Sequence, residues 1–173
     1  MNFKKLKKTF INKQFQRLIL EKEDFRVVSL KEIKTVGILC SDEVSKWIPV
    51  KEEVEKVLNL RNAKIYSFRK FNKNDAVSFK HFSEKDFTWK GEVTQPNFKS
   101  FLDEPFDLLI GFFNKNNLFI ENAVLRSNAK FKVGLSNVNQ KLYDMEIAEY
   151  PKNIDKFLIE LKRYLLILKK LKN

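Results

Sequence analysis

The sequence has little glycine, proline, cysteine or histidine. Its 173 residues include four Gly, four Pro, one Cys and one His. So few glycines and prolines exclude long disordered linkers and low-complexity segments, and the chain has no internal repeat. Cys40 alone cannot close an internal disulfide, and with His81 it cannot supply a structural zinc site. We therefore expect one domain over residues 1–173, with no metal and no cofactor.

Long apolar runs are also missing from the sequence. Leu165–Leu168 is typical of those present, and a bilayer-spanning helix needs about 20 apolar residues. The basic first residues are not followed by the apolar segment of a secretion signal. These absences predict a cytoplasmic protein without a transmembrane segment.

Positive charge is abundant, and most of it lies at the two ends of the chain. The formal net charge is +12; residues 1–34 hold ten Lys and Arg against four acids, and residues 154–173 hold six against two. Two interpretations stay open. The ends form a basic surface for nucleic acid, a membrane periphery or a protein partner, or the charge reflects coding composition, since only six of the basic residues are Arg. The candidate basic surface comprises Lys4, Lys5, Lys7, Lys8, Lys13, Arg17, Lys162, Arg163, Lys169 and Lys170.

Short apolar runs predict the strands of a parallel sheet that is covered on both faces. The four strongest runs, with the first and third expected as neighbours near the centre, are Thr35–Cys40, Ala63–Phe68, Asp107–Phe113 and Phe131–Leu135. A weaker strand is predicted at Tyr143–Ala148, and short strands are possible at Val77–Phe82 and Phe87–Val93.

Helical segments alternate with these runs, over residues 3–22, 41–60, 98–102, 118–127 and from 153. The alternation predicts an α/β, Rossmann-like three-layer domain with a mostly parallel sheet in residues 35–171, plus basic N-terminal and C-terminal helices. The helix over residues 1–22 has two offset apolar stripes and is expected to pack loosely. The final helix has a regular apolar stripe and is expected to belong to the core.

Known phosphate-binding motifs are absent. Gly37 lies inside the first predicted strand, and the turn after it contains Asp42 and Glu43 but no glycine. A glycine-rich turn lets the backbone approach a pyrophosphate, whereas two acids at that turn are expected to repel a phosphate. The standard dinucleotide and P-loop sites are therefore excluded.

Polar side chains follow three of the predicted strands, at the sheet edge where α/β domains bind ligands. The candidate ligand-binding residues are Ser41 and Asp42, Asn114 and Asn116, and Ser136 and Asn137. The same residue types are expected as helix caps and turn residues, and this second interpretation is favoured.

We expect no catalytic residue. His81 lies among aromatic neighbours, and Cys40 ends a buried strand with no evident base beside it. Asp107 precedes its strand at the amino end, where α/β sites rarely lie. Replacement of His81 or Cys40 is expected to change stability rather than activity.

Several strand motifs resemble a known family. Thr35–Leu39, FDLLI at Phe106–Ile110 and AKFKVG at Ala129–Gly134 resemble an uncharacterised bacterial family of small basic α/β proteins, known only as a domain of unknown function. The resemblance implies a cytoplasmic α/β protein without an assigned activity. The FDLLI and KVG strands are also similar to one Rossmann-like half of a two-domain glycosyltransferase, although a second half is missing here.

Two functions follow from these patterns. The first is a non-enzymatic binding or interaction domain whose basic terminal helices contact an anionic surface or a partner. The alternative is an enzyme for a small polar ligand or sugar phosphate, using the carboxyl-end rim. A pocket at Ser41, Asp42, Asn114 and Asn137 favours the alternative, whereas a closed rim and one continuous basic face favour the first.

Overall fold

The fold is built around six parallel strands. The computed structural model describes residues 2–23, 29 and 31–172, so Arg26 of the basic N-terminal region lies outside the described residues. The strands are β1 (Val36–Ser41), β2 (Lys64–Phe68), β3 (His81–Phe82), β4 (Leu108–Phe112), β5 (Lys132–Leu135) and β6 (Met145–Ile147). Their order in the sheet is β3-β2-β1-β4-β5-β6. The predicted Rossmann-like α/β class is confirmed, and β1 and β4 are central neighbours that pair from Val36 with Leu108 onward.

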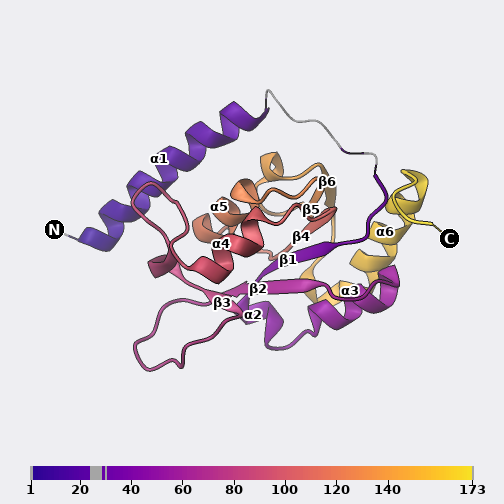
Figure 1. The fold of residues 1–173 in the computed structure, drawn as a ribbon, viewed down its shortest axis with the longest axis horizontal. Coiled ribbons are helices and arrows are strands. Elements are labelled where there is room, and N and C mark those ends of the chain that lie inside the picture. The colour runs from indigo at the N-terminus through magenta and orange to yellow at the C-terminus, as the bar shows by residue number, and fades with distance from the viewer. Residues whose placement is uncertain (1, 24–28, 30, 173) are drawn as a thin grey trace.

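Helices cover both faces of the sheet (Figure 1). They are α1 (Phe3–Glu23), α2 (Asp42–Ser45), α3 (Val50–Leu58), α4 (Pro96–Asp103), α5 (Leu118–Arg126) and α6 (Ile154–Ile167). One core joins one face of the sheet to α3 and α6. A second core, rich in phenylalanine, joins the other face to α1, α4 and α5. Both faces are buried, which explains why the central strands read as continuous apolar runs.

Two glycines let an aromatic ring lie directly on the sheet. Tyr143, which precedes β6, is buried against Gly111 in β4 and Gly134 in β5. A Cβ atom at Gly134 would meet the Tyr143 ring at 2.2 Å, and one at Gly111 would meet the Tyr143 hydroxyl oxygen at 2.2 Å, both far closer than van der Waals contact. The glycines therefore mark a close approach of side chain and backbone, not a turn.

The prediction of one continuous helix over residues 41–60 is wrong. The segment forms two helices, α2 and α3, separated by a turn over Lys46–Pro49. Pro49 has no N–H to donate and disfavours helical backbone at Ile48, so it begins a second helix instead of continuing the first. The short α2 keeps the residues after β1 at the edge of the sheet.

The region between β2 and α4 was the least well predicted. Only His81–Phe82 of the predicted strand Val77–Phe82 joins the sheet, beside β2. Phe87 and Val93 form an isolated antiparallel bridge instead of a strand, around a turn where Gly91 has a φ of +74°. Residues 69–80 instead form a broad loop that borders the candidate functional site.

The two terminal helices lie on opposite faces of the sheet. Helix α1 buries Ile11, Phe15 and Ile19, whereas α6 buries Phe157, Leu158, Leu161 and Leu165 in the other core. The two ends of the chain lie on opposite sides of the molecule in Figure 1. No helix in the described ranges is long and apolar enough to cross a membrane.

Candidate functional site

A polar cleft lies where the order of the strands reverses. In the order β3-β2-β1-β4-β5-β6, the connection from β1 leads toward β2 and the one from β4 leads toward β5. The loops therefore diverge between β1 and β4 and leave a crevice at the carboxyl ends of these strands. The cleft has a volume of about 740 Å³, within the range of roughly 300–1,000 Å³ that is usual for small-ligand sites.

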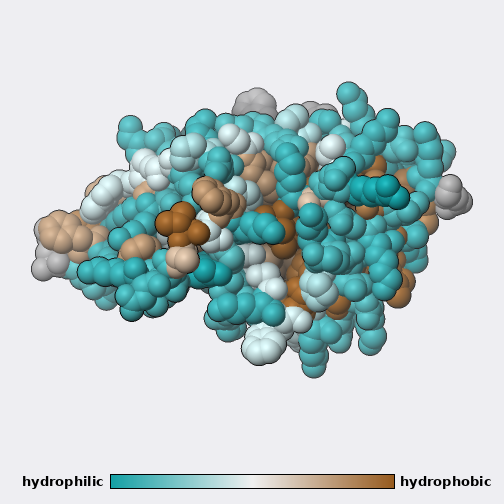
Figure 2. All heavy atoms as spheres, turned by 60° about the horizontal axis from the view of Figure 1, so that its bottom comes forward, coloured by the Kyte–Doolittle hydropathy of each residue, from teal (hydrophilic) through white to brown (hydrophobic). Residues whose placement is uncertain are grey.

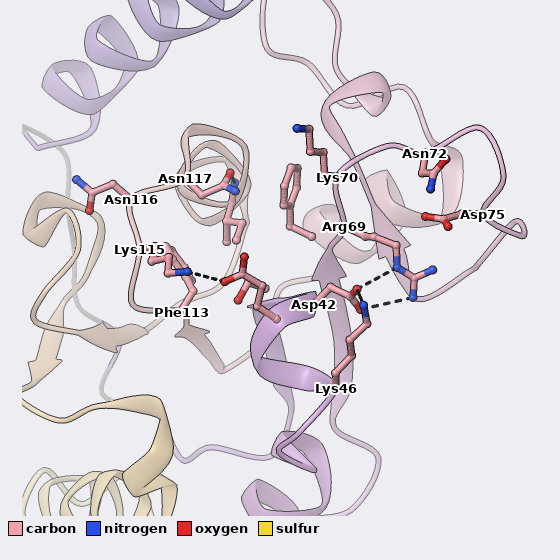
Figure 3. Close-up of a pocket in the computed structure, with 14 residues that line it drawn as sticks. Asp42, Lys46, Arg69, Lys70, Asn72, Asp75, Phe113, Lys115, Asn116 and Asn117 are labelled. Carbon is pink, nitrogen blue, oxygen red and sulfur yellow. Dashed lines mark hydrogen bonds and ion pairs between the residues drawn. The ribbon is translucent and has the colours of Figure 1, made fainter.

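Three loops line this cleft. The loop after β1 provides Ser41, Asp42, Glu43 and Lys46; the loop after β2 provides Phe68, Arg69, Lys70, Asn72 and Asp75; the loop after β4 and the start of α5 provide Phe113, Lys115, Asn116, Asn117 and Ile120. Figure 3 shows Lys115, Asn116 and Asn117 on one side and Arg69, Asn72 and Asp75 on the other, with Lys70 between them. Charged and amide groups thus face each other across the cleft, which Phe68 and Phe113 also line.

Asp42 organises the wall formed by β1 and β2. Its Oδ2 lies 3.2 Å from Arg69 Nε and 2.9 Å from Lys46 Nζ, and its side chain is only 10% exposed. Burial raises the pKa of Asp42, but hydrogen bonds from Lys46 and Arg69 outweigh burial and hold the pKa below its ordinary value. The carboxylate is therefore charged at neutral pH. It pairs with Lys46 and Arg69, so its negative charge partly cancels theirs in this wall of the cleft.

His81 extends the same network behind the cleft. Its Nε2 lies 3.0 Å from Asp42 Oδ1 and 2.8 Å from Arg69 Nη2, and its Nδ1 lies 2.6 Å from Ser78 Oγ. Burial and then the Arg69 charge lower the pKa of His81, more than Asp42 raises it. The ring is neutral at neutral pH. His81 therefore has polar partners besides its aromatic neighbours, and Asp42 and Arg69 lie 39 and 12 residues away from it in the sequence.

Cys40 is buried under the cleft. Its Sγ lies 3.1 Å from Ser67 Oγ, which in turn donates to Ser45 Oγ at 3.0 Å. The thiol thus has a polar partner that the sequence did not reveal. Burial nevertheless raises the pKa of Cys40 to about 11, so the nucleophilic thiolate is not populated at neutral pH.

Lys115 on the opposite wall and Lys70 between the two sides are more available than the cations around Asp42. Lys115 Nζ lies 2.8 Å from Glu43 Oε2, but both side chains are about three-quarters exposed, and such surface pairs are weak. Among the described residues none forms a hydrogen bond or ion pair with the Lys70 side chain. Asn117 is committed to the start of α5, where its Oδ1 accepts from the backbone N–H groups of Phe119 and Ile120. Lys70, Lys115 and Asn116 remain free to meet a ligand.

The predicted rim is divided between two places. Ser41, Asp42 and Asn116 line the cleft, whereas Asn114, Ser136 and Asn137 do not. Ser136 continues the β5–β6 ladder through its N–H to Ile147 O, and Asn137 Nδ2 reaches Asn114 O at 3.5 Å. Asn137 faces a separate hollow beside α1, because β5 lies one strand beyond the reversal point. The carboxyl-end rule therefore selected residues that lie in two separate places.

The predicted basic surface is divided as well. Lys4, Lys5, Lys8, Lys13 and Arg17 are exposed on α1, while Lys7 is half-buried and donates to Glu84 O. Lys162, Arg163 and Lys169 are exposed at or just beyond α6 on the other side of the sheet, where Arg163 pairs with Glu160. Lys170 is buried, with its Nζ bonded to Ser29 O and 4.5 Å from the Phe131 ring centroid. One continuous basic face is therefore excluded, and Lys170 is a structural residue.

Sequence reasoning missed Arg69, Lys70 and Lys115. They were three among 34 basic residues, with no motif around them. Arg69 and Lys70 directly follow the predicted strand that ends at Phe68, so the strand-end rule that selected Ser41 could have selected them.

These features define a doubly wound, all-parallel α/β domain with a polar cleft at its strand-order reversal. The chain belongs to the family of unknown function DUF6913, whose model matches residues 7–168. The expected membership of an uncharacterised family is thus confirmed. No curated protein and no solved structure matches the chain.

Proposed function

We propose that this protein is a binding domain for a small polar ligand with an anionic group, such as a sugar phosphate, held in the cleft between β1 and β4. The observation that carries the proposal is the position of Lys70 and Lys115 around a cleft of about 740 Å³ at the strand-order reversal. Lysine ammonium groups attract phosphate as point charges, without requiring a glycine-rich turn.

The neutral parts of the lining suit the rest of such a ligand. Side-chain amides of Asn72 and Asn116 offer donors and acceptors for hydroxyl groups, and Phe68 and Phe113 supply apolar contact. Asp42 is saturated by its cationic partners, so its role is to hold Arg69 and Lys46 in place. This division favours binding over covalent chemistry, because Cys40 is protonated and buried.

Titration calorimetry with inorganic phosphate, glucose and glucose 6-phosphate tests this proposal. We expect glucose 6-phosphate to bind more tightly than either fragment, since only the whole molecule meets both the lysines and the amides. Each of Lys70→Ala and Lys115→Ala is expected to weaken its binding by about tenfold, the usual value of one charged hydrogen bond.

The matched control is Lys56→Ala on α3, which removes an equally exposed lysine away from the cleft. It is expected to leave glucose 6-phosphate binding unchanged at moderate salt. Absence of binding by all three compounds, or equal weakening by the control, would contradict the proposal.

A further inference from the structure

Helix α1 carries a second stripe of large side chains that is partly exposed. Its inner stripe of Ile11, Phe15 and Ile19 is buried. On the opposite side of the helix, Phe3, Leu6, Phe10 and Leu20 are 63%, 37%, 48% and 59% exposed. With 3.6 residues per turn these positions share one side, roughly half a turn from the inner stripe. The helix is thus apolar on two sides, and only one of them is covered by the described residues.

The exposed side is continuous along the helix and positively charged. Positions alternating by three and four form one line that we call the outer stripe: Phe3, Leu6, Phe10, Lys13, Arg17 and Leu20. Over residues 2–20 the helix holds six Lys and Arg and no acidic residue. The outer stripe therefore combines large apolar groups with positive charge from Lys13 and from Arg17, whose Nε pairs with Glu21 Oε1 at 3.3 Å one turn further along the helix.

Other segments extend the apolar end of this face. The Phe10 ring meets Trp89 edge to face at 5.7 Å between centroids, and Trp89 is itself 43% exposed. Lys7 anchors the helix nearby by donating to Glu84 O at 3.3 Å. In Figure 2 apolar atoms stand at the left end, where Figure 1 places the start of α1, on a surface that is otherwise mainly hydrophilic. The exposed apolar groups are therefore presented on an anchored helix.

We propose that the outer stripe of α1 docks on an anionic membrane surface. A helix that lies in the interface buries its apolar side among the lipid headgroups, while lysine and arginine side chains extend to the phosphates. Tryptophan at the edge of the face suits the same interface. This surface is distinct from the cleft between β1 and β4, so the proposal stands independently of the ligand.

Two other occupants fit the outer stripe less well. A second copy of the chain would bring the Lys13 side chains of both helices close together, while Glu21, the acid on the same side of the helix, is already paired with Arg17. Nucleic acid would neutralise the charge, but it would leave Phe3 and Leu6 with no role. Only an anionic lipid surface uses both the charge and the apolar groups.

Vesicle co-sedimentation of the full chain tests this proposal. The probes are vesicles of phosphatidylcholine alone and of equal parts phosphatidylcholine and phosphatidylglycerol, each at about 0.05 M and 0.5 M salt. We expect binding to the anionic vesicles at low salt, at least tenfold weaker binding at high salt, and no measurable binding to the neutral vesicles.

Paired variants separate the two parts of the interaction. Lys5→Gln with Lys13→Gln is expected to weaken binding about 25-fold, from roughly fivefold for each charge near an anionic surface. Phe3→Ser with Leu6→Ser is expected to weaken binding at least tenfold, because it removes buried apolar area. The altered side chains are exposed, so thermal unfolding followed by circular dichroism should be unchanged.

Matched controls lie on α6, across the sheet. Lys156→Gln with Lys162→Gln, and Ile159→Ser with Ile167→Ser, remove the same groups from exposed positions there. The proposal is overturned if these controls weaken binding as much as the α1 variants do. It is overturned equally by binding to neutral vesicles alone, by a dimer in sedimentation that Phe3→Ser with Leu6→Ser dissociates, or by tighter binding to duplex DNA that this variant leaves intact.

Discussion

Asp42 and Asp107 are two aspartates in similar circumstances at opposite ends of the central strands. Asp42 follows β1 and binds Arg69 and Lys46 beside an open cleft. Asp107 precedes β4, and its carboxylate accepts from the backbone N–H groups of Lys34 and Thr35 and pairs with Lys130 at 2.7 Å. Around both, attractive partners outweigh burial and lower the pKa.

The difference between them lies in what each aspartate holds. Two of the partners of Asp107 are backbone N–H groups, and they fix the entry of β1 against β4. The partners of Asp42 are side chains, and two of them, Lys46 and Arg69, also line the cleft. The polar groups around Asp107 thus join β1 to β4 at the amino end of these strands, whereas those around Asp42 border an open cleft at their carboxyl end. This contrast explains why a shared chemistry produces structure at one end and a site at the other.

The largest effect on stability is expected around Asp107, at the amino end of β4. Asp107→Ala leaves two backbone donors and the Lys130 ammonium without their acceptor, so we expect a loss of about 3 kcal/mol in the free energy of unfolding, measured by urea denaturation. Binding of glucose 6-phosphate should not change. Asp103→Ala is the control, since its pair with Lys99 is exposed and worth under about 1 kcal/mol. A stability loss no larger than that of the control would break the comparison.

At the open end, Asp42→Asn is expected to cost less stability, about 1 kcal/mol, because Lys46 and Arg69 can turn to water. Removing a negative charge from the cleft should at the same time tighten glucose 6-phosphate binding, roughly threefold at low salt. Calorimetry and urea denaturation on the same samples measure both changes. Loss of binding would show instead that Asp42 contacts the ligand itself.

His81 should make stability depend on pH at the open end. Its pKa in the folded state lies below the ordinary value, first because of burial and then because of Arg69. The unfolded chain therefore takes up the proton first as the pH falls through about 6.5, and stability present above that pH is lost on acidification. Urea denaturation of the wild type should show a fall between about pH 7.5 and 5.5 that His81→Gln reduces. An identical slope in Asp107→Asn is the control, and an unchanged slope in His81→Gln would count against this account.

The sequence predicted the central part of the fold better than its edges. Residues around Ile38 and Ile110 are covered on both faces and leave a continuous apolar run, and the four principal strands were found from such runs. Strand β3 has only two residues, too few to show the alternation of apolar and polar side chains from which a strand is predicted. The single helix predicted over residues 41–60 is divided into two at Pro49.

The site was predicted only in part, for a different physical reason. Ser41 and Asp42 could be found because a strand end fixes their place, and Asn116 because it follows the next central strand. Which loops lie side by side depends on the order of the strands in the sheet. The residue pattern within each segment does not reveal that order. Ser136 and Asn137 were therefore included although β5 is too far from the reversal, and the partners of His81 could not be identified.

The smallest expected effect concerns Cys40, below the open end of the sheet. Its thiol is fully buried, and burial raises its pKa to about 11. Since thiolate is the reactive form, labelling of the native protein by a disulfide reagent should be at least a hundredfold slower than labelling in denaturant. Cys40→Ala should cost at most about 1.5 kcal/mol, because only the small sulfur group and its contact with Ser67 are lost. Its binding of glucose 6-phosphate should match the wild type. Fast native labelling, or loss of binding in Cys40→Ala, would show that the cleft reaches the thiol and that the open end extends deeper than Asp42.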